Sequence, residues 1–122
     1  MSTETVVEKT WRMLLERHPE ARRGDPAVIE AASAEPRLRR LFPFPSHGCL
    51  NFHRNTDFPW SNDLPRIAGG VKGYLVYGAG ARYAELLGEV ATPQEAAALV
   101  VAHLPSDCGA AVEGPWHGAD SF

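Results

Sequence analysis

The residues best suited to chemistry gather in one stretch, FPFPSHGCLNFHRNTDFPWSND, which runs from Phe42 to Asp63. It holds four of the five phenylalanines, one of the three tryptophans, two of the five histidines and one of the two cysteines. Rings and ionisable groups at this density indicate a polar and aromatic surface, because rings anchor a ligand while polar groups orient it. The residue types alone do not name a reaction.

Metal binding is the first chemistry that these side chains suggest. Thiolate, imidazole and carboxylate groups all bind zinc, and the stretch offers His47, Cys49, His53, Asp57 and Asp63. Their spacing matches no closed structural zinc site, and Cys49 and His53 share a face only if the strand between them is regular. We therefore predict that the protein needs no metal, and a metal-dependent hydrolase is the least favoured of three functions.

Covalent catalysis is favoured less than metal binding. Ser46 and Ser61 lie in no nucleophile-elbow pattern, and Cys49 occupies a position where a core thiol is usual. The run Gly78-Ala79-Gly80 precedes a predicted strand, whereas a phosphate loop needs a following helix and a lysine or serine within it. These residues predict no cofactor and leave the catalytic residue unknown.

Ligand binding is the chemistry that the pattern favours. Alternation over residues 48–54 places Cys49, Asn51 and His53 on one polar face of a strand. Trp60 lies in a turn-like segment, where it either anchors a peptide or covers one end of the sheet as a lid. The predicted substrate-binding residues are Phe44, His47, Asn51, His53, Arg54, Trp60 and Asp63.

Helices are predicted on both sides of this stretch. Apolar spacing and a capping box indicate a helix over residues 4–18. A capping aspartate followed by proline starts a second helix over residues 25–34. A short third helix spans residues 36–42, and a fourth spans residues 92–104, where Ala96, Leu99, Val100 and His103 line one side.

Strands are predicted between the third and fourth helices, at residues 48–54, 64–68, 71–77 and 83–90. Short turns that contain glycine join the last three, which favours an antiparallel meander. Residues 106–122 are either disordered or a tail that docks on its own domain or on a second copy. The predicted fold is α+β, one domain over residues 1–122, with N-terminal helices, a four-stranded antiparallel meander, a C-terminal helix and a tail.

Composition excludes two classes of partner. The 122 residues carry a formal net charge of −3, which argues against nucleic acid because phosphate binding needs an excess of clustered Lys and Arg. No apolar run approaches the roughly 20 residues that span a bilayer, so no membrane partner is expected. Cys49 and Cys108 lie far apart in a chain without a secretion signal. We expect a cytoplasmic protein with both thiols reduced.

The sequence also resembles a known family. The run LFPFPSHGCLNFHRNTDFPWSNDLP, followed after two predicted strands by LLGEVATPQEAAALVVAHLP, is similar to small actinobacterial proteins encoded in natural-product peptide clusters. The best understood of these install the lysinoalanine bridge of cinnamycin- and duramycin-type lanthipeptides, and the resemblance covers about residues 36–105. It implies a cofactor-free homodimer that binds a ribosomally made, modified peptide and promotes attack of a lysine amine on a dehydroalanine.

The implied reaction is compatible with a site that has no catalytic constellation. The addition needs an uncharged amine close to the alkene, and with a lysine pKa of about 10.4 roughly one amine in a thousand is uncharged near pH 7. Orientation alone can lower a barrier by about 7 to 11 kcal/mol, so a protein that folds its substrate into the reactive geometry suffices. The alternative is a non-catalytic peptide- or protein-binding module, such as an immunity or accessory protein, that uses the same surface.

Overall fold

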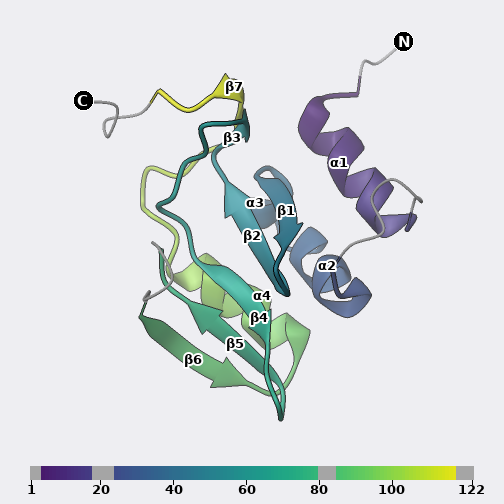
Figure 1. Cartoon of the computed structure of the whole chain (residues 1–122), viewed down its shortest axis with the longest axis vertical. Coiled ribbons are helices and arrows are strands. Elements are labelled where there is room, and N and C mark those ends of the chain that lie inside the picture. Colours follow the sequence, from purple (N-terminus) through teal and green to yellow (C-terminus); the bar gives the residue numbers. More distant parts are fainter. Residues whose placement is uncertain (1–3, 18–23, 80–84, 118–122) are drawn as a thin grey trace.

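The computed structural model describes residues 4–17, 24–79 and 85–117. These residues form an α+β fold, as predicted, with N-terminal helices, an antiparallel sheet and a C-terminal helix. Figure 1 views the sheet from the face that the helices leave uncovered, with α3 and α4 behind the strands.

Capping residues set the helices of the described chain. These are α1 (Val6–Leu15), α2 (Pro26–Ser33), α3 (Pro36–Arg39) and α4 (Pro93–Ala102). Thr5 and Glu8 form the predicted capping box of α1, and the side chains of Asp25 and Thr92 accept backbone N–H groups at the starts of α2 and α4. His103 follows the end of α4 and is exposed, whereas Ala96 and Val100, predicted on the same side of the helix, are buried. No helix among the described residues has the length and apolar character to cross a membrane.

The main sheet has five strands in the described chain, one more than predicted. They are β1 (Phe42–Ser46), β2 (Cys49–His53), β4 (Arg66–Gly69), β5 (Tyr74–Tyr77) and β6 (Leu86–Val90). Neighbours pair antiparallel in the order β1-β2-β4-β5-β6. The predicted third strand begins late, at Tyr74, because Val71 lies fully exposed between β4 and β5.

The additional strand is β1, at residues for which the sequence predicts no strand. Its alternate residues Pro43 and Pro45 are buried, and prolines are tolerated here because an edge strand leaves one side free of ladder hydrogen bonds. A two-residue turn joins β1 to β2, with φ of 51° at His47 and 77° at Gly48. Positive φ at both positions is typical of a type I′ turn, which fixes the register of the hairpin.

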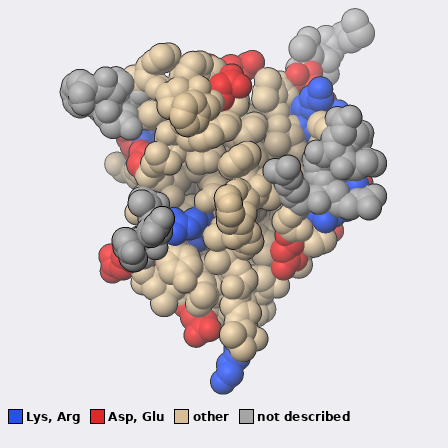
Figure 2. Space-filling view, in the orientation of Figure 1, with Lys and Arg blue, Asp and Glu red and all other residues tan. Residues whose placement is uncertain are grey.

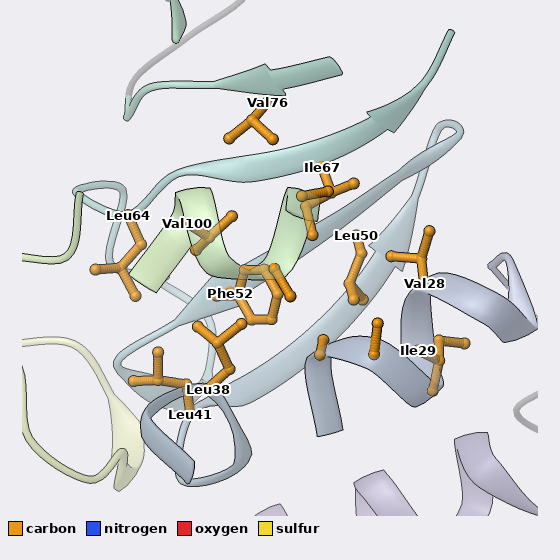
Figure 3. Packing of buried hydrophobic residues seen from close by; sticks show 14 of the residues in the cluster. Val28, Ile29, Leu38, Leu41, Leu50, Phe52, Leu64, Ile67, Val76 and Val100 are labelled. Carbon is orange, nitrogen blue, oxygen red and sulfur yellow. The ribbon is translucent and has the colours of Figure 1, made fainter. Parts of the chain in front are cut away.

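The core lies between the sheet and the helices (Figure 3). Its central side chains, each at most 4% exposed, are Leu50, Phe52, Ile67, Val76 and Val100. Trp11 of α1 is fully buried and donates its indole N–H to the Leu41 carbonyl over 3.0 Å. This bond ties α1 to the chain just before β1.

A small second sheet joins the tail to the domain. β3 (Asn55–Asp57) forms within a segment predicted as a turn, and it pairs in parallel with β7 (Val112–Pro115). Residues 106–117 therefore pack on their own chain. Residues 118–122, which include the terminal Phe122 of the predicted docking tail, lie outside the described residues.

Gly73 tests the packing between β5 and β6. A Cβ at this position would collide with the backbone carbonyl of Val90, and a backbone atom cannot move aside as a flexible side chain can. We expect Gly73→Ala to lower the free energy of unfolding by about 1–3 kcal/mol, measured by urea unfolding. Gly69→Ala is the matched control, since no atom lies within 4 Å of a Cβ added there. Equal stability of the two variants would contradict this packing.

Candidate functional site

Four rings form an aromatic cluster on the uncovered face of the sheet: Phe42, Phe44, His53 and Trp60. The strand residues point away from the core because the residues between them are buried. Trp60 comes from the loop after β3 and lies nearly flat over the other three rings, with centroids 4.8 to 5.5 Å apart. Figure 2 shows that uncharged residues form the middle of this face, with charged side chains mostly toward its margin.

Burial favours the neutral form of the His53 imidazole. Burial lowers its pKa below the ordinary value, against the opposing hydrogen bond to the Ser61 carbonyl. Nδ1 lies 2.9 Å from that carbonyl oxygen, which can only accept, so Nδ1 carries the proton and Nε2 keeps the lone pair. Nε2 bonds to no described residue and is not fully enclosed. It is therefore an acceptor that a ligand can reach.

A small cavity lies beside the aromatic cluster. Its volume is about 40 Å³, and Asn51, His53 and Arg66 line it together with Phe52 and residues 61, 62 and 64. The Arg66 guanidinium carbon lies 5.3 Å from the centroid of the Tyr77 ring. The sequence analysis missed Arg66, although alternation about the buried Ile67 places it on the same face as His53.

Arg54 and Asp63 lie apart from the aromatic cluster. Arg54 lies in the bend between β2 and β3, outside either strand. It forms an ion pair of 2.7 Å with Asp63, donates to the Asp107 carbonyl over 3.2 Å and stacks 5.3 Å from the Trp116 ring. Although burial opposes its charge, Asp63 holds the pKa of Arg54 above its ordinary value. The pair joins the loop to the tail.

His47 also lies away from the cluster. It is exposed in the β1–β2 turn, with Nδ1 2.8 Å from the Ser46 hydroxyl, and four residues of β2, roughly 13 Å of strand, separate this end from His53. A larger cavity of about 590 Å³ lies here, between the turn, the start of α2 and the β4–β5 hairpin. The structure thus brings together four of the seven predicted binding residues: Phe44, Asn51, His53 and Trp60.

Asn55 positions the loop that carries Trp60, and the sequence analysis missed it. Its amide is fully buried and donates to the carbonyls of Asp57, Pro59 and Gly114, while its side-chain oxygen accepts the Ser61 N–H over 3.0 Å. The Asn55 side chain therefore forms hydrogen bonds with the backbone of the residues before and after Trp60, and with the backbone of β7. The sequence gives no sign of this role, because Asn55 meets the carbonyls of Pro59 in the loop and Gly114 in the tail only after the chain has folded.

Ser61 and the tail complete this support. The Ser61 hydroxyl accepts the Arg54 backbone N–H over 2.7 Å, so it is engaged in structure rather than placed as a nucleophile. The Trp116 backbone N–H donates to the Pro59 carbonyl over 2.9 Å. The position of Trp60 over His53 therefore depends on the docked tail.

Comparison with known proteins identifies a family but no characterised relative. The model described as "Family of unknown function (DUF6193)" matches residues 5–115, a range that includes every element from α1 to β7. No curated protein and no solved structure matches the chain. Across the residues that the structure describes, no three His, Cys, Asp or Glu side chains are grouped so as to hold a metal ion.

Replacing Asn55 tests whether it supports the loop. We expect Asn55→Ala to lower the free energy of unfolding by at least about 2 kcal/mol, because buried backbone groups lose their partners. Amide hydrogen exchange at Gly114 and Trp116 should also become faster. Asn62→Ala, at an exposed position in the same loop, is the control. Unchanged stability and exchange in Asn55→Ala would refute the role.

The lowered pKa of His53 predicts a pH dependence of stability. The unfolded chain binds a proton here at a higher pH than the folded chain does. Stability should therefore fall as pH drops below about 6.5, by at most about 1.4 kcal/mol per pH unit, until the folded-state pKa is reached. Urea unfolding at about pH 7.5 and about pH 5.5 should show a smaller loss for His53→Gln than for the wild type. His47→Gln, at the exposed turn, is the control. If His53→Gln lost as much stability between the two pH values as the wild type does, the burial argument would be contradicted.

Proposed function

We propose that this chain, which belongs to a family of unknown function (DUF6193), is a peptide-modifying cyclisation enzyme of lanthipeptide maturation. It binds a modified peptide on the uncovered face of the sheet and promotes addition of a lysine amine to a dehydroalanine. The observation that carries the proposal is the aromatic cluster, with Trp60 stacked over His53 at 4.8 Å beside a small polar cavity.

Rings displayed beside polar groups suit the recognition of a peptide. Aromatic side chains supply large contact areas with few rotatable bonds, and such anchors dominate the energy of protein interfaces. Trp60 stacks on the cluster and is only partly buried, so part of its side chain is available for contact. Asn51 and Arg66 add hydrogen-bonding groups at the border of the cavity.

The proposed chemistry needs orientation more than it needs a strong acid or base. The amine nitrogen forms a bond to the β-carbon of dehydroalanine, the double bond breaks, and the electron pair moves onto the α-carbon as an enolate. The proton lost by nitrogen balances the proton gained at the α-carbon, so no oxidant or reductant enters. Holding the two groups in contact contributes about 7 to 11 kcal/mol, which a rigid binding face can supply.

A second function uses the same face without chemistry. A peptide- or protein-binding module would also present stacked rings around a polar cavity, and the two functions differ in whether the bound peptide gains a ring. The homodimer expected from the resemblance stays a prediction, as does the cytoplasmic location. The two cysteines, Cys49 and Cys108, are both free in the structure, which fits a reducing compartment.

Truncating the cluster tests the proposal. If the peptide covers Trp60, Trp60→Ala should lose apolar contact worth about 1.5–3 kcal/mol, which is roughly a 10- to 150-fold weaker Kd. Calorimetry with a cinnamycin-type peptide that carries its thioether rings and dehydroalanine would measure binding, and mass spectrometry with thiol capture of dehydroalanine would measure ring closure.

Phe58→Ala is the matched control. Phe58 lies two residues before Trp60 in the same loop and is 79% exposed, outside the cluster, so its loss should leave Kd within about threefold, which is roughly 0.6 kcal/mol. Binding without ring closure would favour the non-catalytic module. Absence of binding in the wild type, or equal losses in the two variants, would refute the proposed site.

A further inference from the structure

We propose that the cavity lined by Asn51, His53 and Arg66 binds the lysine amine of the peptide in its uncharged form. This inference rests on the proposed function and names the group that the cavity recognises. It assigns to the protein the step that makes the nucleophile available.

The size of the cavity favours a single small polar group. About 40 Å³ exceeds the roughly 10–15 Å³ that one water molecule needs, so the cavity has room for a small polar group. A primary amine at the end of a lysine fits this space. The cavity opens beside the rings of the cluster, along which the aliphatic part of a lysine can lie.

The hydrogen-bonding groups also match an amine. His53 has its proton fixed on Nδ1 by the Ser61 carbonyl, so its Nε2 accepts a hydrogen bond from an amine N–H. Asn51 donates its side-chain N–H to the Phe44 carbonyl over 3.1 Å, which leaves its side-chain oxygen as a second acceptor. Two acceptors orient the two N–H bonds of an uncharged amine and direct its lone pair away from the cavity wall.

The electrostatics of the cavity disfavour an ammonium ion. Of the described residues that line it, Arg66 on β4 alone carries a charge, while Asn51 and His53 on β2 and the loop residues 61, 62 and 64 are uncharged. Asp63 lies in the same loop but does not line the cavity, and its carboxylate pairs with Arg54. A neighbouring cation and removal from water both lower the pKa of a lysine.

The lysine ammonium releases its proton to solvent when it binds in the cavity. No protein base is then needed to remove that proton. Each unit by which the pKa of the lysine falls raises the uncharged fraction near pH 7 about tenfold. His53 acts by accepting a hydrogen bond, because a neutral histidine whose own pKa is lowered is too weak a base to deprotonate an ammonium ion. The uncharged amine then attacks the alkene that the same surface holds beside it.

The experiment is an NMR titration of lysine in a bound peptide that cannot react. The probe is a cinnamycin-type peptide with its thioether rings, alanine at the position of the dehydroalanine, and ¹⁵N at Nζ of its lysine. We expect this lysine to titrate at least about one pH unit lower when bound than when free, which is tenfold in the uncharged fraction.

Charge variants separate the effect of Arg66 on the bound lysine from the effect of a change in the protein's net charge. Arg66→Leu and Arg66→Gln should move the titration of bound lysine back toward that of the free peptide, and Arg66→Lys should keep most of the shift. Lys72→Leu removes the same charge at an exposed position between β4 and β5 and should leave the shift unchanged. Thermal unfolding confirms that each variant is folded.

The outcomes distinguish this inference from the proposed function. A peptide that binds but whose lysine titrates as in the free state, or whose shift survives in both Arg66→Leu and Arg66→Gln, would overturn the inference and leave peptide binding intact. A peptide that does not bind the wild-type protein would overturn the proposed function, and the inference with it.

Discussion

The buried amide of Asn55 is the interaction on which the rest of the site depends. A polar side chain without access to water must find partners within the protein, and Asn55 finds them in the loop before Trp60, in the residue after it and in β7. Its oxygen holds Ser61, whose carbonyl in turn fixes the tautomer of His53. The buried amide of Asn55 therefore links the docking of the tail to the position of the Trp60 ring. Through Ser61 it also links the tail to the proton on Nδ1 of His53.

The β1–β2 hairpin supplies both the core and the candidate site. Because side chains of a strand alternate between faces, Leu50 and Phe52 pack under the sheet while Asn51 and His53 stand on the uncovered side. The two prolines of β1 turn inward and Phe42 and Phe44 turn outward on the same principle. Core packing thus fixes the geometry of the outer rings, and the outer face needs no helix of its own to hold it in place.

Local signals predicted the parts of the fold that depend on neighbours in sequence. The helix starts at Thr5, Asp25 and Thr92 could be predicted because a capping residue acts within one turn of helix. The edge strand β1 was missed because prolines weaken the strand pattern that pairing with β2 restores. Arg54 and Asp63 were predicted at the site from their charge, but they bond to each other and to the tail. Contacts of this kind join residues that are distant in sequence, and no periodicity in the sequence announces them.

The central claim is that the uncovered face, and not another surface, receives the peptide. Backbone ¹H–¹⁵N NMR spectra recorded as the peptide is added would map the contact directly. The account predicts shifts that cluster on β1, β2, β4 and residues 60–64, with α1 and α4 unchanged. Shifts centred instead on the cavity between the β1–β2 turn and α2, or spread over the helices, would contradict it.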